Sequence, residues 1–599
     1  MPPLRGPGGR NQGPVKKPKN TKATLKRLAG YLRGDRAKLG FAFFCVLLSA
    51  ASNLAGSYLL RPIINNYIAP PGGATGNTLG LLHGLLLMAA VYLAGVLATY
   101  FQTRTMIGIS QRALSKIRSE LFTKMQKLPV RFFDTNPTGD VMSRYTNDVD
   151  TIGEMLNNTI VQIISGVISI VGTLTLMLYT NVWLTIVTLV MAPIMAKVGT
   201  TIAARSRKHF GKQQAALGAV NGYIEESVTG QKVIKVFCHE DQTVEEFSKL
   251  NDALRNAQVK AQFAGGIMGP VMNAMGQVNY TLTAGVGAVL CVLKGFDVGG
   301  LAVFVNFSRQ FSRPINEFAQ QLTTVMSALA GAERVFEVMD LEPETVGANE
   351  KPMEHIKGDV IIDHVTFGYN PDKTILKDVS IYAHPGQKIA LVGSTGAGKT
   401  TITNLITRFY EINKGKITID GVDIENITRD SLRENIAVVL QDTHLFTGTV
   451  MENIRYGRLD ATDDEVRAAA VTASAHSFIR HLPQGYQTVL EGDGANLSQG
   501  QRQLLNIARA ALSKAPILVL DEATSSVDTM TEKHINEGMD ALMENRTTFV
   551  IAHRLSTIRN ADAIMVLEHG EIIERGSHQE LLEQKGRYYE LYTGLKELD

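Results

Sequence analysis

The first 340 residues of the 599-residue chain alternate long apolar stretches with polar ones. Six apolar stretches, at about 39–66, 79–105, 155–180, 182–204, 265–293 and 298–325, are each long enough to cross about 30 Å of hydrocarbon as a helix. An even number of crossings returns the chain to the side on which it began. We therefore predict an α-helical polytopic membrane domain over residues 39–339, with six transmembrane helices.

The connections between these stretches predict the orientation. Those near 67–78, at Thr180-Asn181 and near 294–297 are short and carry almost no positive charge, whereas 106–154 and 205–262 are long and rich in Lys and Arg. Cytoplasmic connections carry the excess of positive charge, so we expect the long connections and both termini to be cytoplasmic. Their helical periodicity continues beyond membrane length, which predicts helices that extend into the cytoplasm.

Turn residues interrupt each long connection once. The interruptions lie at Asn136 and Gly139 in the first and at Thr229 and Gly230 in the second. They predict turns at the far ends of two helical hairpins. From periodicity alone, these turns either dock on another domain or simply cap the hairpins.

The remaining segments differ in composition. Residues 1–23 are rich in Pro, Gly and Lys and predict a disordered tail, and 24–38 combine basic residues with an apolar stripe, as in an interfacial elbow helix. Residues 340–357 have the composition of a linker. From residue 358 to 599, alternating strands and helical patterns predict a separate α/β domain.

Polar side chains recur within the last two apolar stretches. They are Asn273 and Gln277 in the fifth, and Asn306, Arg309, Arg313 and Glu317 in the sixth. Polar groups at membrane depth usually face a water-filled cavity or one another. Arg313 and Glu317 are spaced i, i+4, so they either form an internal ion pair or line a substrate path together with the other four. Hydrogen bonding between helices is an equal alternative for the fifth stretch.

Composition adds two limits. The formal net charge of +3 indicates no nucleic-acid partner. The three cysteines are far apart and odd in number, so they encode neither a disulfide framework nor a metal cluster.

A phosphate-binding loop follows the first predicted inner strand of the α/β domain. The segment GSTGAGKTT fits G-x-x-x-x-G-K-[ST] and consists of Gly393, Ser394, Thr395, Gly396, Ala397, Gly398, Lys399, Thr400 and Thr401. Its glycines allow the backbone N–H groups to face phosphate oxygens, and Lys399 would bridge the β- and γ-phosphates. The Thr400 hydroxyl would take Mg²⁺. A glycine turn that binds nothing is the alternative, which the strand–loop–helix setting disfavours.

A second apolar strand, ILVLDE, ends in two carboxylates. Ligands bind at the carboxyl ends of strands in α/β sheets, so Asp521 would hold Mg²⁺ through water. Glu522 would then act as the general base that polarises the attacking water.

With these motifs in place, the segment LSQGQ resembles the signature LSGGQ of the ABC transporter family, with Gln499 in place of the first of its two glycines. Other marks of the family occur in order: Tyr369 as the aromatic that stacks on adenine, Gln441 as the catalytic and metal-binding Q-loop glutamine, Ser525 to Asp528 as the D-loop, and His553 as the switch histidine. The resemblance covers essentially the whole chain and is to half-transporters of the type I exporter fold. It implies Mg²⁺-dependent hydrolysis of ATP in the cytoplasmic domain of a multi-pass protein of the cell membrane.

The resemblance also implies a dimer, because the phosphate loop of one ATPase domain pairs with the signature, here Ser498, Gln499, Gly500 and Gln501, of the other. It implies that the turns at Asn136 and Gly230 are coupling helices. An altered signature beside an intact Glu522 and His553 resembles the consensus-site subunit of bacterial heterodimeric multidrug exporters, whose partner chain has a degenerate catalytic site. We therefore expect export of hydrophobic or amphipathic compounds. The alternatives are a homodimeric flippase for lipids or lipid precursors and an ATP-gated channel.

Overall fold

The structure is a computed structural model that describes residues 20–68, 78–344, 350–353, 355–441, 443–521, 529–551 and 559–593. It contains two compact units. The helical unit is Met1–Leu128 with Thr135–Glu342, and the sheet unit is Pro129–Asp134 with Pro343–Asp599.

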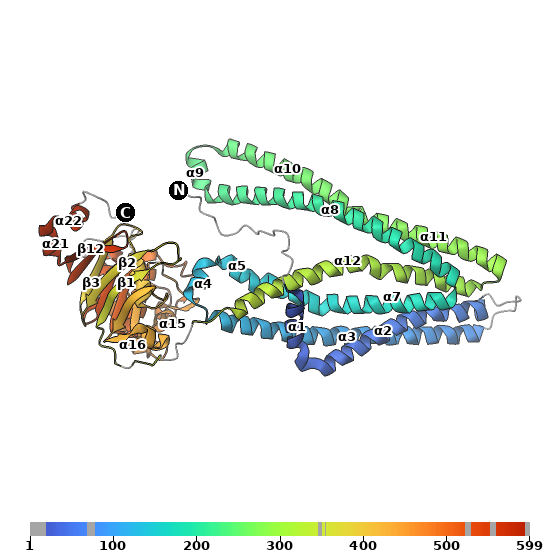
Figure 1. Cartoon of the computed structure of the whole chain (residues 1–599), viewed down its shortest axis with the longest axis horizontal. Helices are drawn as coiled ribbons and strands as arrows, with labels where there is room; N and C mark the ends of the chain where they lie inside the picture. The colour runs from blue at the N-terminus through green and yellow to red at the C-terminus, as the bar shows by residue number, and fades with distance from the viewer. Residues whose placement is uncertain are drawn as a thin grey trace. The chain divides into compact units, whose positions relative to one another are not determined.

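The helical unit consists of long helices joined by short turns (Figure 1). α12 packs against α2, α7 and α11, and α8 packs against α10 and α11. The helices are α1 (Thr21–Leu32), α2 (Arg36–Ile63), α3 (Thr78–Met125), α5 (Thr138–Ser143), α6 (Val149–Glu154), α7 (Ile160–Thr180), α8 (Val182–Thr229), α9 (Gln231–Val236), α10 (Glu240–Gly266), α11 (Met268–Lys294) and α12 (Val298–Asp340).

Side-chain caps and a glycine determine where two of the tight turns fall. The Asn181 side chain accepts a hydrogen bond from the Leu184 backbone N–H, which begins α8 one residue after α7 ends. Gly295, at φ +65°, terminates α11, and the Asp297 carboxylate caps α12 by accepting from the Gly300 N–H. The short connections predicted at Thr180-Asn181 and near 294–297 are therefore tight joints between helices.

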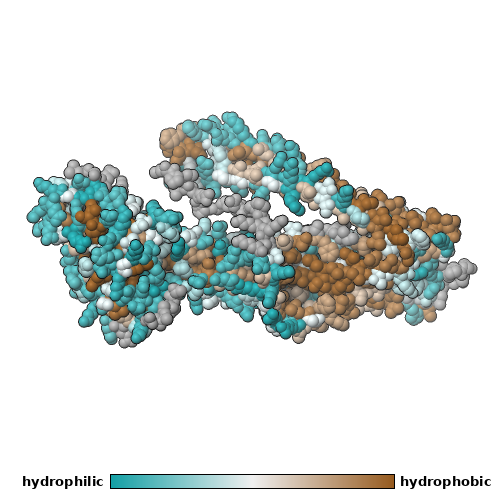
Figure 2. All heavy atoms as spheres, viewed as in Figure 1, coloured by the Kyte–Doolittle hydropathy of each residue, from teal (hydrophilic) through white to brown (hydrophobic). Residues whose placement is uncertain are grey.

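The longest helices exceed the thickness of a bilayer. α3 and α8 have 48 residues each, which at 1.5 Å per residue is about 72 Å, against about 30 Å of hydrocarbon. On the face shown in Figure 2, hydrophobic residues gather over α2, α3, α7 and α11, whereas hydrophilic residues cover much of α10. Each long helix therefore divides into an apolar part and a polar extension.

Five of the six predicted crossings lie in helical stretches whose length and composition suit a membrane span. These stretches are Thr21–Ile68, Thr78–Met125, Thr138–Thr180, Val182–Thr229 and Glu240–Lys294. Among the described residues, α12 does not reach the same hydropathy, although it is 43 residues long. Its polar residues, including Arg309, Arg313 and Glu317, account for the difference.

Short helices occupy the two interruptions of the long connections. α4 (Val130–Thr135) precedes Asn136, and Gly139 lies in the first turn of α5. Thr229 ends α8, and Gly230 leads into α9. The first predicted turn thus lies between two short helices, and the second leads into one.

The sheet unit contains two larger sheets. A six-stranded sheet has the order β12 (Glu571–Gly576), β11 (Ala563–Glu568), β3 (Lys388–Gly393), β10 (Thr547–Ile551), β9 (Ile517–Asp521) and β6 (Ile436–Val439). All its neighbouring pairs are parallel except β11 with β12. A four-stranded antiparallel sheet has the order β2 (Leu376–Ala383), β1 (Val360–Phe367), β4 (Lys414–Ile419) and β5 (Val422–Asp423), and β7 (Gly448–Thr449) pairs with β8 (Val489–Leu490).

Helices complete the sheet unit and divide its core in two. They are α13 (Lys399–Ile406), α14 (Arg429–Glu434), α15 (Val450–Arg455), α16 (Asp463–Thr472), α17 (His476–His481), α18 (Gln499–Ser513), α19 (Thr529–Met543), α21 (His578–Gln584) and α22 (Arg587–Tyr592). One core cluster joins α13 and the antiparallel sheet to the six-stranded sheet, and the other joins α16, α18 and α19 to it. The inner strands are buried on both faces, which explains their continuous runs of Ile, Leu and Val.

Candidate functional site

The phosphate loop begins where β3 ends. At two of its positions, Gly393 and Gly398, neighbouring atoms leave no room for a side chain. A Cβ on Gly393 would lie 2.2 Å from the Leu567 carbonyl oxygen, and one on Gly398 would lie 2.6 Å from Leu376 Cδ2. Gly396 has φ +82° and Gly398 has φ +107°, conformations that residues with side chains rarely adopt. The loop therefore turns tightly before α13 begins at Lys399 and forms a backbone cradle of the kind that holds phosphate.

Lys399 is the buried cation of this loop, with 6% of its surface exposed. Its Nζ donates hydrogen bonds to the carbonyl oxygens of Gly393 (2.5 Å) and Ser394 (3.1 Å). Burial lowers the pKa of Lys399, and the negative charge of Asp521 acts in the opposite direction. The ammonium group therefore already lies inside the loop, where an entering phosphate would replace the two carbonyl oxygens as its partners.

The other loop residues differ in accessibility. Thr395 and Thr400 are exposed, Ser394 is half-buried, and Ala397 and Thr401 are buried. The exposed Thr400 hydroxyl lies in the first turn of α13, the position that the motif assigns to a metal ligand.

Parallel strands bring the other candidate groups to the same edge of the sheet. β3, β10, β9 and β6 run in the same direction, and Ile551 pairs with both Leu391 and Asp521. Asp521 ends β9 and is half-buried, and the exposed Gln441 follows the end of β6. The carboxyl edge of the sheet thus carries the phosphate loop after β3, Asp521 at the end of β9 and Gln441 after β6, with β10 between β3 and β9. Glu522, Ser525, Asp528 and His553 lie outside the described residues.

Tyr369 follows β1 and lies over the start of α13. Its hydroxyl is 3.3 Å from Thr401 Oγ1 and accepts a hydrogen bond from Asn404 Nδ2 (3.2 Å). Its ring meets the Tyr410 ring edge to face, with 4.8 Å between centroids. These contacts hold the predicted adenine-stacking aromatic beside the phosphate loop.

The signature segment starts α18 through a reciprocal cap. The Ser498 hydroxyl accepts from the Gln501 N–H (3.2 Å), and the Gln501 side chain accepts from the Ser498 N–H (3.0 Å). Gly500 is buried, whereas the Gln499 side chain is exposed. The residue that departs from the family pattern therefore points to solvent within this unit.

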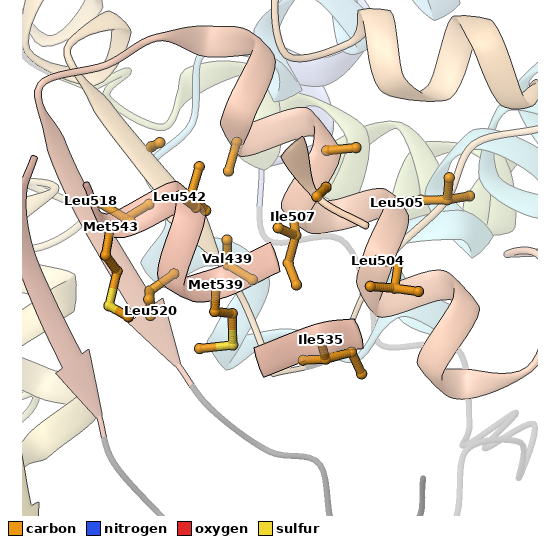
Figure 3. Packing of buried hydrophobic residues seen from close by; sticks show 14 of the residues in the cluster. Val439, Leu504, Leu505, Ile507, Leu518, Leu520, Ile535, Met539, Leu542 and Met543 are labelled. Atoms are coloured by element: carbon orange, nitrogen blue, oxygen red, sulfur yellow. The ribbon is translucent and has the colours of Figure 1, made fainter. Parts of the chain in front are cut away.

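Two sets of contacts hold α18 in place. Leu504 and Ile507 belong to the buried cluster that includes Leu520 and Val439 of the sheet, and Figure 3 shows these side chains gathered between α18 and the strands. On the other side, Arg509 donates to the backbone carbonyls of Asn453 (2.6 Å) and His444 (2.6 Å).

The role of Arg509 is one that sequence reasoning missed. It ties the signature helix to His444, three residues after Gln441. An arginine on an amphipathic helix is ordinarily solvated, and nothing in its spacing shows that the half-buried Arg509 donates to backbone carbonyl groups.

Both predicted coupling turns, at Asn136 with Gly139 and at Thr229 with Gly230, lie in the helical unit, but the segment just before the first turn belongs to the sheet unit. Pro129–Asp134, which includes most of α4, clusters with that unit, where the Tyr410 hydroxyl donates to the Asp134 carboxylate. Burial, followed by this carboxylate, raises the pKa of Tyr410. The other turn, α9, presents Val233, Val236 and Phe237, which are all exposed.

The helical unit contains a cavity of about 480 Å³ between α8, α11 and α12. Five of the six polar residues singled out above line it, namely Asn273, Gln277, Arg309, Arg313 and Glu317. The sixth, Asn306, instead donates to Ser57 Oγ of α2 (3.4 Å). Arg313 and Glu317 form the expected i, i+4 ion pair (3.1 Å) and also line the cavity. The alternative that the pair lines a substrate path stays a prediction.

Comparison with known proteins identifies both units. Residues 39–315 match the ABC transporter transmembrane region, and residues 376–525 match the ABC transporter ATPase family. The chain is 47% identical to the uncharacterized ABC transporter ATP-binding protein YfiC of Bacillus subtilis (strain 168), over 96% of this chain and 95% of that protein. It is 41% identical to the fatty acid ABC transporter ATP-binding/permease protein of Mycobacterium tuberculosis (strain CDC 1551 / Oshkosh), over 85% of this chain and 80% of that protein.

A solved structure supports the same assignment. A bacterial Atm1-family ABC exporter with ATP bound resembles this chain with a TM-score of 0.75 at 30% identity, covering 94% of this chain and 98% of the other. The chain therefore belongs to the ABC transporter family, as a multi-pass membrane half-transporter of the exporter type that couples ATP hydrolysis to transport.

Proposed function

We propose that this chain exports hydrophobic or amphipathic compounds across the cytoplasmic membrane by alternating access, as one half of a heterodimer. The observation that carries the proposal is that the same chain combines an exposed Gln499 in its signature with an intact phosphate loop. In this family the signature of one chain faces the nucleotide of the other. A side chain at position 499 would crowd the γ-phosphate held by the partner, whereas this chain's own site has no such obstacle.

We infer the roles at this chain's own site from its motifs, supported by the contacts of Lys399 and Tyr369. Lys399 would exchange its two loop carbonyls for the β- and γ-phosphates, and Tyr369 would stack on the adenine. Thr400, Gln441 and, through water, Asp521 would hold Mg²⁺, which neutralises charge on the phosphates. Glu522 would accept the proton of the attacking water, oriented with the help of His553.

We assign the transmission of movement between the ATPase domain and the membrane helices to two short helices, α4 and α9. α4 already belongs to the compact unit that carries the phosphate loop. The exposed apolar side chains of α9 would dock on the partner's ATPase domain. ATP can shift the conformation of the membrane helices only to the extent that it binds the state with closed ATPase domains more tightly than the state with separated ones. The ATPase domain and both termini would then be cytoplasmic.

A second candidate is a homodimeric flippase for lipids or lipid precursors. The relative named as a fatty acid transporter favours a lipid-like substrate. The cavity is consistent with either candidate, because it combines the apolar Met195 and Met272 with polar side chains. Dependence on a partner chain separates the two.

The transport activity can be tested in inside-out vesicles whose membrane contains the assembled transporter. ATP should drive uptake of a fluorescent amphiphile, and Glu522→Gln should abolish uptake while ATP remains bound. Turnover in this variant should fall by about a thousandfold or more, because the general base is lost and the shape is kept. Uptake equal to wild type in Glu522→Gln would refute the assignment.

A further inference from the structure

The cavity between α8, α11 and α12 lies well away from the end at which α12 begins. Arg309 is eleven residues into α12, which begins at Val298. At 1.5 Å per residue, its backbone lies about 17 Å from that end, close to the middle of about 30 Å of hydrocarbon. With the start of α12 taken as the edge of the hydrocarbon, the cavity places a guanidinium group near the bilayer midplane.

Two neutral groups hold this guanidinium. It lies 4.4 Å from the centroid of the Tyr280 ring, and its NH2 group donates to Gln277 Oε1 (3.4 Å). Both partners orient the cation, and neither neutralises it.

The nearby carboxylate is already engaged. Glu317 pairs with Arg313 at 3.1 Å. Across the described ranges, Arg309 has no carboxylate within 4 Å. The cavity walls thus carry two arginines and one carboxylate, a formal excess of one positive charge.

A counter-ion stabilises such a charge at this depth more than water alone does. The Arg309 side chain is exposed in this chain, and a guanidinium facing lipid tails is strongly disfavoured. An anionic ligand in the cavity supplies that counter-ion. The thioether side chains of Met195 and Met272 line another part of the wall, and such flexible apolar groups suit an aliphatic chain.

We propose that Arg309 binds the acidic headgroup of the transported compound, and that the preferred substrates are amphiphiles with a carboxylate at one end. This inference rests on the proposed function of the chain as an exporter of amphipathic compounds. The Tyr280 ring and Gln277 hold the guanidinium of Arg309, which lines the cavity, so part of the entropy cost of ordering this side chain is already met before the carboxylate binds.

The test uses the assembled transporter in nanodiscs of zwitterionic lipid at pH 8. ATPase stimulation is titrated with dodecanoic acid, dodecanol and dodecylamine, which share one chain length and differ in headgroup charge. The acid should act at about a tenfold lower concentration than the alcohol. Arg309→Gln should remove this preference, Arg309→Lys should retain part of it, and Arg309→Glu should transfer it to the amine.

Arg255→Gln is the matched control. Arg255 lies on α10, where it pairs with Asp252 at 3.2 Å away from the cavity, and its loss should leave the preference for the acid unchanged. Equal stimulation by acid and alcohol in wild type would overturn the inference and leave the exporter proposal standing. If Arg309→Gln retained the preference for the acid, the inference would also be overturned and the exporter proposal would still stand. That result would point to neutralisation of Arg309 by a carboxylate of the partner chain. No stimulation or transport of any amphiphile by a transporter that hydrolyses ATP would refute the proposed function itself, and this inference with it.

Discussion

Gly393 at the start of the phosphate loop offers a quantitative test of the site's geometry. Replacement by Ala would place Cβ 2.2 Å from the Leu567 carbonyl oxygen, on the strand that pairs with β3. Contacts of this kind are rarely below 3.0 Å, so the two strands would have to separate by about 1 Å, and the backbone cannot move aside as a side chain can. We expect a loss of more than about 3 kcal/mol in stability and the loss of the phosphate cradle.

Two other glycines separate this clash from ordinary backbone strain. Gly386 and Gly396 both have φ +82°, and a Cβ on either meets no atom within 4 Å. Ala at either position should therefore cost only the left-handed backbone conformation, about 1–2 kcal/mol. Gly396 lies in the phosphate loop and Gly386 lies in the turn before β3, so their variants should match in stability and differ in ATP binding.

The assay combines thermal unfolding of the full chain in nanodiscs with titration of a fluorescent ATP analogue. Gly386→Ala should lower the unfolding midpoint slightly and leave ATP affinity unchanged, whereas Gly396→Ala should lower both. Gly393→Ala should lower the midpoint most and bind no nucleotide. The reasoning is refuted if Gly393→Ala is no more destabilising than Gly386→Ala.

Two further predictions use matched pairs. Ser498→Ala and Ser577→Ala each remove the hydroxyl of a reciprocal helix cap, so each should cost about 1 kcal/mol of stability. In the proposed heterodimer Ser498 faces the partner's degenerate site, so neither variant should lower ATP hydrolysis by the assembled transporter by more than about twofold; a loss of about tenfold in Ser498→Ala alone would show that this signature completes a hydrolysing site and would contradict the heterodimer. Asp148→Asn removes a buried carboxylate that accepts two hydrogen bonds from Arg334 (2.9 and 2.5 Å), and should cost about 1–3 kcal/mol in thermal unfolding. Asp150→Asn breaks an exposed pair with Arg118 and should cost less than about 1 kcal/mol, so an equal effect of the two substitutions would show that burial does not decide the cost.

Local patterns predicted those parts of the molecule that depend on neighbours in sequence. The phosphate loop follows from glycine spacing after a buried strand, and the joint at Thr180-Asn181 follows from two polar residues between two apolar runs. The Asn181 side chain that caps α8 there was found only in the structure. The carboxyl-edge position of Asp521 could be predicted in the same way, because parallel strands present their ends on one edge.

Features that depend on packing between distant segments were not predictable from the sequence. Periodicity places Asn306 and Arg309 together in one helix, yet Asn306 contacts Ser57 on α2 while Arg309 lines the cavity. The side of the helix that each faces depends on which helices surround α12. The carbonyl groups that accept hydrogen bonds from Arg509 likewise belong to residues 56 and 65 positions away in the sequence.

The central claim is that this chain is the catalytically intact half of an asymmetric exporter. ATP hydrolysis should be measured for the chain purified alone in lipid nanodiscs, and again together with the half-transporter encoded by the adjacent reading frame. The account predicts that substantial hydrolysis requires both chains, because the altered signature at Gln499 cannot complete a second copy's site. Hydrolysis at full rate by the chain alone would contradict the heterodimer and favour a homodimer that tolerates Gln499.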